Sequence, residues 1–264
     1  MNRHIILTHG RSGSNNLANT LNLHPQIVNY GEVLGAWTLP RRLHGAARRV
    51  FASDSCDYLK YVYSSRTFFY GAQLYSALSH LRKRKRLNLK SLRDVTNIGI
   101  KDFVAQFQRD PGALDFLAER KDIAVIRLHR ENLLRRYVSL LSMRRNGVVA
   151  AEGETRRLGK LTVGVQEMLW DLELMEQQQG YEMSMMARLR GHRLFVLKYE
   201  DYFASAESMA AGNKGLFEFL GVPPVAERSA HHKILPRDWT EIVDNYDEFR
   251  RAVINTRYEK YLDS

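Results

Sequence analysis

The opening of the chain constrains its fold more than any other feature, because a short apolar run leads into a glycine-containing loop and then into a helix-period segment. His4–Thr8 is the apolar run, and its length suits a buried strand. Gly10 and Gly13 let the loop turn sharply, and Asn15–Leu23 repeats apolar residues at the helical spacing. A strand, a tight loop and a helix in this order are typical of an α/β protein with a parallel sheet.

The same alternation continues along the chain. Further buried strands are predicted at Asn97–Lys101, Ile123–His129 and Arg193–Tyr199. Helices are predicted at Asn132–Arg145, at Leu161–Leu189 with Gly180 as a break, and at Trp239–Leu262. We therefore predict a P-loop-like, three-layer α/β/α fold in which a central parallel sheet is flanked by helices. A single domain over 1–264 is expected, with helical insertions around 33–95 and 145–190, because no linker-like composition interrupts the sequence.

Composition excludes several classes of protein. The 264 residues are 44% apolar, which suits a globular protein with a sizeable core and argues against disorder. Cys56 is the only cysteine, so neither an intrachain disulfide nor a cysteine metal cluster is expected. No signal-peptide core and no bilayer-length apolar run is visible, which predicts a cytoplasmic protein, with peripheral contact to a membrane left open. The net charge of +11 implies an anionic partner: nucleic acid, a membrane surface or a small phosphorylated molecule.

The loop after the first predicted strand is a candidate anion site. Its backbone N–H groups and the positive end of the following helix would face one point, an arrangement that suits a phosphate. Arg11 adds a positive charge, and Ser12 and Ser14 add hydroxyl donors. Ser14 or Asn15 is expected to cap the helix. The plainer interpretation is a surface turn rich in serine and glycine that happens to contain one arginine.

The loop lacks the motif that binds a nucleoside triphosphate. In Gly-x-x-x-x-Gly-Lys-Ser/Thr, counted from Gly10, the last three positions would be Asn15, Asn16 and Leu17. None of the three fits. A nucleotide-dependent small-molecule kinase is therefore kept as an alternative and not as the leading hypothesis.

A second candidate anion site follows the run Ile123–His129. Arg130 stands at the carboxyl end of that predicted strand, where open α/β sheets bind ligands. Arg135 and Ser139 lie one helical turn apart on the segment that follows. The alternative is a solvated basic face made by Arg135, Arg136, Arg144 and Arg145.

Four segments, in chain order, match one enzyme family. They are Arg11–Asn16, Arg130 with Ser139, Leu197–Asp201 and Phe217–Pro223. The chain resembles the PAPS-dependent sulfotransferases, in which the first segment is the 5′-phosphosulfate loop and the second is the 3′-phosphate-binding element. The third is similar to a Tyr-Glu-Asp segment that closes a later strand, and the fourth to the short helix-turn after it. The resemblance is nearest to the bacterial carbohydrate enzymes that act on Nod factors and sulfolipid sugars.

The chain departs from the family pattern in two places. The interval from Arg130 to Ser139 is one residue longer than the family's usual interval, so either the start of the helix is shifted or Arg135 shares the role of Ser139. The C-terminal Arg-Lys-Gly phosphate clamp of the cytosolic enzymes is missing. Lys233 or Arg237 is a candidate replacement.

The resemblance implies transfer of a sulfuryl group from PAPS to a hydroxyl of a carbohydrate, a glycolipid or a similar small acceptor, with PAP as product and no metal. Arg11 would neutralise the leaving phosphate, and backbone N–H groups around Gly13 would hold it. The residues implied to bind the donor are Arg11, Ser12, Gly13, Ser14, Asn15, Asn16, Arg130, Ser139 and Tyr199. A sulfotransferase acting on a secondary metabolite is a further alternative.

The reaction also needs a base for the acceptor hydroxyl. Glu32 is the candidate, because the carbohydrate enzymes of this family place a glutamate shortly after the first helix. Its other interpretation is an exposed loop carboxylate. Asp102 and His129 are the alternatives for the base, and Lys101 is expected to face the same crevice and support the transferring group.

Several features have no place in that scheme. The basic run Arg82–Arg86 favours a solvated helix face, or else contact with an acidic membrane or an acidic glycan surface. The sequence argues against nucleic acid, because no DNA- or RNA-binding motif accompanies the run. Trp37, Trp170 and Trp239 are assigned to the core, although Trp37 follows Glu32 closely enough to stack on a sugar. The sequence gives neither the acceptor nor the oligomeric state.

Overall fold

The computed structural model describes residues 1–48, 54–82, 87–147, 151–152, 159–225, 231–232, 236 and 238–263. Its centre is a five-stranded sheet in the order β2-β3-β1-β4-β6, and every neighbouring pair is parallel. The strands are β1 (Asn2–Thr8), β2 (Ile27–Asn29), β3 (Asn97–Phe103), β4 (Ile123–His129) and β6 (Leu194–Lys198). A separate two-stranded antiparallel sheet pairs β5 (Ala151–Glu152) with β7 (His231–His232). The predicted α/β fold with a central parallel sheet is confirmed.

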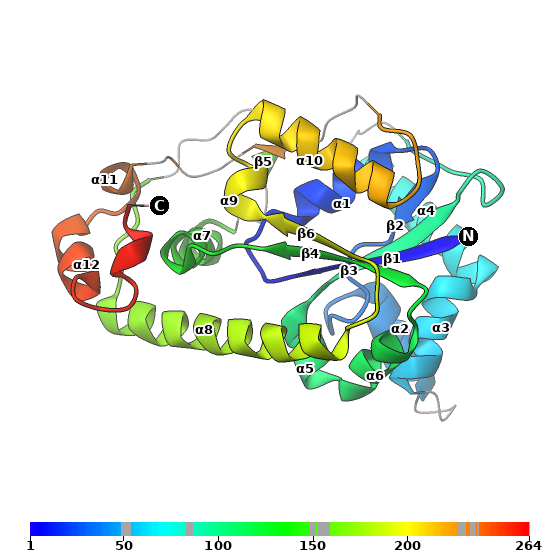
Figure 1. Cartoon of the computed structure of the whole chain (residues 1–264), viewed down its shortest axis with the longest axis horizontal. Coiled ribbons are helices and arrows are strands. Elements are labelled where there is room, and N and C mark those ends of the chain that lie inside the picture. Colours follow the sequence, from blue (N-terminus) through cyan, green and yellow to red (C-terminus); the bar gives the residue numbers. More distant parts are fainter. Residues whose placement is uncertain are drawn as a thin grey trace.

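Helices cover both faces of the sheet. Figure 1 shows α1 and α10 on one side and α5, α6 and α8 on the other. The helices preceding β4 are α1 (Ser14–Leu23), α2 (Leu39–Arg48), α3 (Ser55–Ser64), α4 (Arg66–Arg82), α5 (Val104–Arg109) and α6 (Pro111–Glu119). Those following it are α7 (Leu133–Asn146), α8 (Val165–Arg188), α9 (Tyr199–Tyr202), α10 (Ala206–Phe219), α11 (Trp239–Ile242), α12 (Tyr246–Val253) and the 3₁₀ helix η1 (Glu259–Tyr261).

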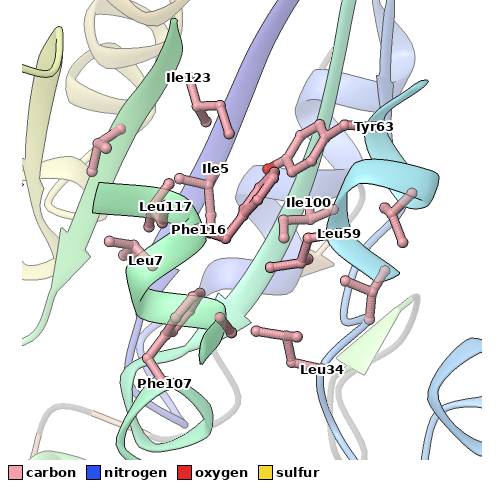
Figure 2. Close-up of a cluster of buried hydrophobic side chains, with 14 of the residues drawn as sticks. Ile5, Leu7, Leu34, Leu59, Tyr63, Ile100, Phe107, Phe116, Leu117 and Ile123 are labelled. Atoms are coloured by element: carbon pink, nitrogen blue, oxygen red, sulfur yellow. The ribbon is translucent and has the colours of Figure 1, made fainter. Parts of the chain in front are cut away.

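The strands form where the sequence is continuously apolar, because a parallel sheet covered on both faces must bury both sets of side chains. Ile5 of β1 lies opposite Ile100 of β3 and Val125 of β4, and all three are buried. Alternate side chains feed two cores. Figure 2 shows the core on the side of α3, α5 and α6, where Ile5, Leu7 and Ile100 meet helical residues such as Leu59, Phe107 and Phe116.

The opposite face packs Ile6 and Ile126 against Leu17 and Leu21 of α1 and Leu216 of α10. A third cluster lies beyond the strand ends and joins α7, α8, α11 and α12. Helix α8 contributes Met168 and Leu172 to this cluster and Met185 to the core of Figure 2. One long helix therefore links the sheet to the C-terminal helices, as Figure 1 shows.

Two predicted helices end differently from the expectation. Helix α8 continues through Gly180, because one interior glycine costs only about 1 kcal/mol and the helix is anchored at both ends. The predicted helix Trp239–Leu262 is instead divided into α11, α12 and η1. The break occurs because Val243 pairs in a parallel bridge with Leu161, and Asn245 exchanges hydrogen bonds of 2.8 and 2.9 Å with the backbone of Val163.

The assignment of all three tryptophans to the core is wrong for two of them. Trp239 is buried, whereas Trp37 and Trp170 are more than half exposed. Helical insertions were expected around 33–95 and 145–190; the first of these segments contains α2, α3 and α4, and α8 lies within the second. Among the described residues, no helix has the length and apolarity that crossing a bilayer requires.

Candidate active site

Three neighbouring strands end at one edge of the sheet. The register places Thr8 of β1 opposite both Phe103 of β3 and Leu128 of β4. The β1–α1 loop (residues 9–13), the end of β3 and the residue that follows β4 are therefore neighbours, at the edge where open α/β sheets bind ligands. These three positions carry the predicted residues Arg11, Lys101 and Arg130.

The β1–α1 loop makes two left-handed turns. Arg11 has φ 67° and Gly13 has φ 76°, whereas Gly10 is not in this region. A left-handed arginine is uncommon and marks a position that the surrounding structure over-determines. At Gly13 a Cβ would lie 2.4 Å from Phe203 Cε2, so only glycine fits there. The left-handed turn at Arg11 was not predicted, because the sequence has no glycine at that position.

Helix α1 begins at Ser14, one residue earlier than predicted, and Gly13 is its N-cap. The expected cap from Ser14 or Asn15 does not form: within the described residues, no side chain hydrogen-bonds the N-cap position. The first N–H groups of α1 thus start from a glycine and carry no competing side-chain oxygen. That leaves the positive end of the helix directed at the space beside the loop.

Three arginines surround the loop. The Nε of Arg11 donates to Ser139 Oγ at 3.0 Å, across from α7. Arg130 Nη1 donates to the carbonyl of Arg11 at 2.9 Å, and Arg136 Nε donates to the carbonyl of Gly10 at 3.1 Å. Arg11, Arg130 and Ser139, which the sequence predicted as partners of one ligand, are therefore brought together.

These arginines are costly to hold near one another. Burial, followed by the charge of Arg130, lowers the pKa of Arg11, and the same two causes lower the pKa of Arg136 to about 10. Burial also lowers the pKa of Arg130. A cluster of like charges with reduced solvation is stabilised by an anion placed among them. The loop is therefore electrostatically prepared for a negatively charged group.

Besides Arg136 Nη1, Ser12 Oγ and Arg130 Nε are buried polar atoms at the loop that have no hydrogen-bond partner within the described part of the chain. Ser12 is fully buried and Arg130 nearly so. Buried donors are normally satisfied, and an exception at a candidate site points to a group that the site binds. Both atoms are donors, as a phosphate or sulfate would require.

Tyr199 forms one side of this region. The Arg130 guanidinium carbon lies 4.2 Å from the centre of the Tyr199 ring, and Tyr199 contacts the ring of Phe203 with centres 4.7 Å apart. The next residue, Glu200, accepts hydrogen bonds from the backbone N–H groups of Glu131 and Asn132 at 3.2 and 3.0 Å. The Tyr-Glu segment therefore fixes both the side chain of Arg130 and the start of α7.

Arg135, which was considered as sharing the role of Ser139, contacts other residues. Its guanidinium stacks 3.9 Å from the ring centre of Trp239 and donates to the carbonyl of Pro236 at 3.2 Å. Burial lowers its pKa, and the charge of Arg130 lowers it further. Arg135 is therefore near the site in charge terms, while Ser139 makes the contact with Arg11.

Lys101 and Glu32 form an ion pair at the end of β3, and Lys101 is almost completely buried. Lys101 Nζ also donates to Asn15 Oδ1 at 3.0 Å, which ties the pair to the first turn of α1. The other carboxylate oxygen of Glu32 accepts from Trp37 Nε1 at 2.9 Å. Glu32, Lys101 and Asn15 thus lie together, and Glu32 remains partly exposed.

Asp102 and His129, the alternative bases, are placed elsewhere. Asp102 lies on the same face of β3 as Ile100, is fully buried, and accepts hydrogen bonds from the backbone N–H groups of Val33 and Leu34 at 3.0 Å each. Burial raises its pKa to about 7 in spite of those two hydrogen bonds. It positions the segment after Glu32 and has no open route to a substrate. His129 lies 3.9 Å from Glu131, beside β6, two strands away from Lys101.

Sequence reasoning missed the support that α8 gives the loop. His9 Nε2 lies 3.0 Å from Glu182 Oε2, and Arg127 Nε donates to Glu182 Oε1 at 2.7 Å. Although burial alone would raise it, hydrogen bonds from His9 and Arg127 lower the pKa of Glu182 to about 2. One turn earlier, Gln178 accepts from Arg136 Nη2 at 2.7 Å.

The alternative of a solvated basic face does not hold for Arg136, because this residue is buried. Its spacing was the available signal: Leu133, Arg136 and Tyr137 share one helical face. Asn16 is buried within α1, and Ser14 is buried at its start. Lys233, Arg237 and the run 83–86 lie outside the described residues. No group of three or more potential metal ligands occurs among the described residues.

No family model and no curated protein matches the chain. Similar solved structures include the sulfotransferase domain of the Synechococcus PCC 7002 olefin synthase, at 14% identity and a TM-score of 0.43, covering 100% of this chain and 86% of that one. The sulfotransferase from Alicyclobacillus acidocaldarius has 14% identity and a TM-score of 0.44, covering 100% of this chain and 96% of that one. The sulfotransferase domain from the curacin biosynthetic pathway has 14% identity and a TM-score of 0.44, covering 100% of this chain and 90% of that one.

The structural neighbours are sulfotransferases. At these identities and TM-scores the likeness carries no argument about the reaction of this chain. The fold rests on the parallel sheet itself, and the candidate site rests on the contacts described above.

Proposed function

We propose that the protein transfers a sulfuryl group from PAPS to a hydroxyl of a carbohydrate or glycolipid acceptor. The observation that carries this proposal is the meeting of Arg11, Arg130 and Ser139 at one loop, since Arg11 donates to Ser139 and Arg130 donates to the loop carbonyl. A donor with a 5′-phosphosulfate and a 3′-phosphate needs cationic groups at two places. Arg11 on the loop and Arg130 with Ser139 beyond β4 provide such groups on adjacent strands.

The residues around the loop fit such a donor. Ser12 Oγ and Arg130 Nε are buried donors without a partner among the described residues, and the N–H groups that follow Gly13 face the same space. Tyr199 stands beside Arg130 and would contact the adenine. When bound, PAPS supplies the sulfuryl group and leaves as PAP.

The acceptor side of the reaction falls to Glu32 and Lys101. The acceptor oxygen forms a bond to sulfur, its proton passes to the Glu32 carboxylate, and the bond from sulfur to the bridging phosphate oxygen breaks. The electron pair remains on that phosphate oxygen, where Arg11 offsets the charge. Glu32 is held by Lys101 at one oxygen and by Trp37 at the other, which fixes its direction and leaves lone pairs for the proton.

Trp37 favours a sugar as the acceptor. Its indole is exposed although it is hydrogen-bonded to Glu32, so an apolar ring face stands open next to the proposed base. Tryptophan combines a large apolar ring with a polar N–H group, and here the N–H group is held by Glu32. The C–H face of a sugar ring could lie on the indole with a hydroxyl directed at Glu32. We place the reaction in the cytoplasm.

Donor binding is tested by calorimetry with PAP and with AMP, which lacks the 3′-phosphate. The wild type should bind PAP at least tenfold more tightly than AMP. Arg130→Ala should lose most of that difference, because a hydrogen bond to a charged group contributes about 1.5–3 kcal/mol. The exposed Arg93→Ala is the control and should bind both ligands as the wild type does. Binding of ATP–Mg²⁺ with no response to PAP would favour a kinase and overturn the proposal.

Catalysis is tested with Glu32→Gln and labelled PAPS on a panel of sugar and glycolipid acceptors. Transfer should fall by about 10²–10⁴-fold, the usual contribution of a general base, while PAP affinity is retained. The exposed carboxylate variant Glu119→Gln should keep normal turnover. Normal turnover in Glu32→Gln would show that the base lies elsewhere.

A further inference from the structure

Helix α4 has an unusual composition for a surface helix. From Thr67 to Leu81 it contains no Asp, Glu, Lys or Arg. The structure describes all of α4, and Phe69 is its one buried side chain. A charge-free helix of this length is normally enclosed by protein, and one that lies at the surface calls for an explanation.

Four of the five large exposed apolar side chains of α4 form one stripe, and the fifth, Tyr75, lies to one side of it. The stripe consists of Tyr70 at 53% exposure, Leu74 at 61%, Leu78 at 54% and Leu81 at 58%. These positions are spaced by four, four and three residues, so they follow one another along the same side of the helix. We call this set the α4 face. Figure 1 shows α4 at the end of the sheet where β2 lies, on the outside of the molecule.

The surroundings of the α4 face are positively charged. No acidic residue occurs between Asp57 and Asp94 in the sequence. Arg66 and Arg82 stand at the two ends of α4, and both are exposed. Lys60 on the preceding helix is also more than half exposed, although it pairs with Asp57 at 3.4 Å. The face therefore combines exposed leucine and tyrosine with basic residues and with no carboxylate of its own.

We propose that the α4 face docks on an anionic membrane surface. An amphipathic helix lying in the interface buries its apolar residues at the boundary of the acyl chains, while flanking arginines meet acidic headgroups. A nucleic acid would match the charge but leave the leucines unused. A second copy of the chain would match the leucines but bring Arg66 and Arg82 toward like charges in a two-fold contact. An anionic membrane matches both the exposed leucines and the flanking arginines. This proposal does not depend on the proposed sulfuryl transfer.

The test is co-sedimentation of the full chain with vesicles of phosphatidylcholine alone and with vesicles containing phosphatidylglycerol, without donor or acceptor. Binding should be at least tenfold stronger to the anionic vesicles and should weaken as salt is raised. The double variant Leu74→Glu/Leu78→Glu should lose at least tenfold. Trp170→Glu, an equally exposed apolar residue on α8, is the matched control and should bind as the wild type does.

Unchanged PAP binding by the double variant shows that it is folded and separates this result from the fate of the proposed function. Equal binding to both vesicle types, or no binding to either, would overturn the proposal. So would a wild-type dimer in size-exclusion chromatography that becomes a monomer in the double variant, because the α4 face would then belong to a second copy.

Discussion

The molecule carries positive charge in two regions that differ in how the charge is held. Around the β1–α1 loop, Arg130 and Arg136 are buried, and each donates to a loop carbonyl at a defined distance. On α4, Arg66 and Arg82 are exposed at the ends of an apolar stripe. Fixed and desolvated charge can recognise the shape of one small anion, whereas exposed charge recognises only that a surface is negative. The two regions, which share the net charge of +11, are therefore suited to the two kinds of anionic partner proposed above.

The difference also has a cost in stability. Burial lowers the pKa values of Arg11 and Arg130, and the charge of Arg130 lowers that of Arg11 further, so the folded protein holds both at a disadvantage when no anion is bound. The arginines of α4 carry no such penalty, because water solvates them. Substitutions at the site should therefore have large and specific effects, and substitutions on α4 should have small ones.

The largest expected effect on stability concerns Asp102, whose pKa burial raises to about 7. The fold favours the neutral carboxyl. The contribution of Asp102 to the unfolding free energy is therefore fully present below pH 3.8 and is lost as the pH rises toward 7. His4 acts in the opposite direction, because burial lowers its pKa to about 3. The informative quantity is therefore the difference in unfolding free energy between the wild type and Asp102→Asn, measured in urea from pH 4 to 8. Between pH 4 and pH 7 the unfolding free energy of the wild type should fall by about 4 kcal/mol relative to that of Asp102→Asn, and above pH 7 the difference should stay constant.

The control for this series is Asp201→Asn, an exposed carboxylate, whose difference from the wild type should show no comparable change over the same range. A difference that stays flat for Asp102→Asn from pH 4 to 7 would mean that the buried carboxyl does not titrate there. The rigid support of the segment after Glu32 would then need another explanation.

Gly13→Ala should have the next largest effect. Its left-handed backbone costs about 1–2 kcal/mol for any other residue, and the new Cβ would meet Phe203 at 2.4 Å. Unfolding free energy and PAP affinity should both fall. Gly10→Ala is the matched control in the same loop, because its φ is not positive and nothing lies within 4 Å of its Cβ position. If the two variants behave alike, the loop is less constrained than its contacts indicate.

The smallest effect is expected for Arg82→Ala, compared with Arg136→Ala. Unfolding free energy in Arg82→Ala should stay within about 0.5 kcal/mol of the wild type, with PAP affinity unchanged. Arg136→Ala removes the contact to the Gly10 carbonyl and should weaken PAP binding. Equal loss of PAP binding in both variants, measured by calorimetry, would erase the distinction between the two regions.

The parts of the fold that sequence could predict are those with a continuous local signal. Ile123–His129 was predicted with the bounds that β4 has, because seven apolar-rich residues between turn residues leave little choice. The candidate residues Arg11, Lys101 and Arg130 were found because each stands at the end of such a run. Strand β2, with only three residues, gave no comparable signal.

The remaining features depend on contacts between distant segments. The separation of α11 from α12 is caused by pairing with Leu161 and Val163, which no local pattern records. Arg136 and Glu182 are buried because α7, α8 and the loop pack together: Arg136 contacts Gln178 of α8, and Glu182 contacts His9 of the loop. The exposed Trp37 is another case, because a large aromatic residue is assigned to a core by default, and its hydrogen bond to Glu32 is visible only in three dimensions.

Helix α8 also bears on whether the loop could be moved to another protein. Gln178 and Glu182, one turn apart, hold Arg136 and His9, and those two residues fix the loop from the side opposite α1. A strand, loop and helix copied by themselves into a new scaffold would keep the motif and lose these braces. The transferable unit is therefore discontinuous: it joins the first twenty-odd residues to Arg136 of α7 and to a single turn of α8. Any lineage that shortened α8 from its middle would have to rebuild the loop as well.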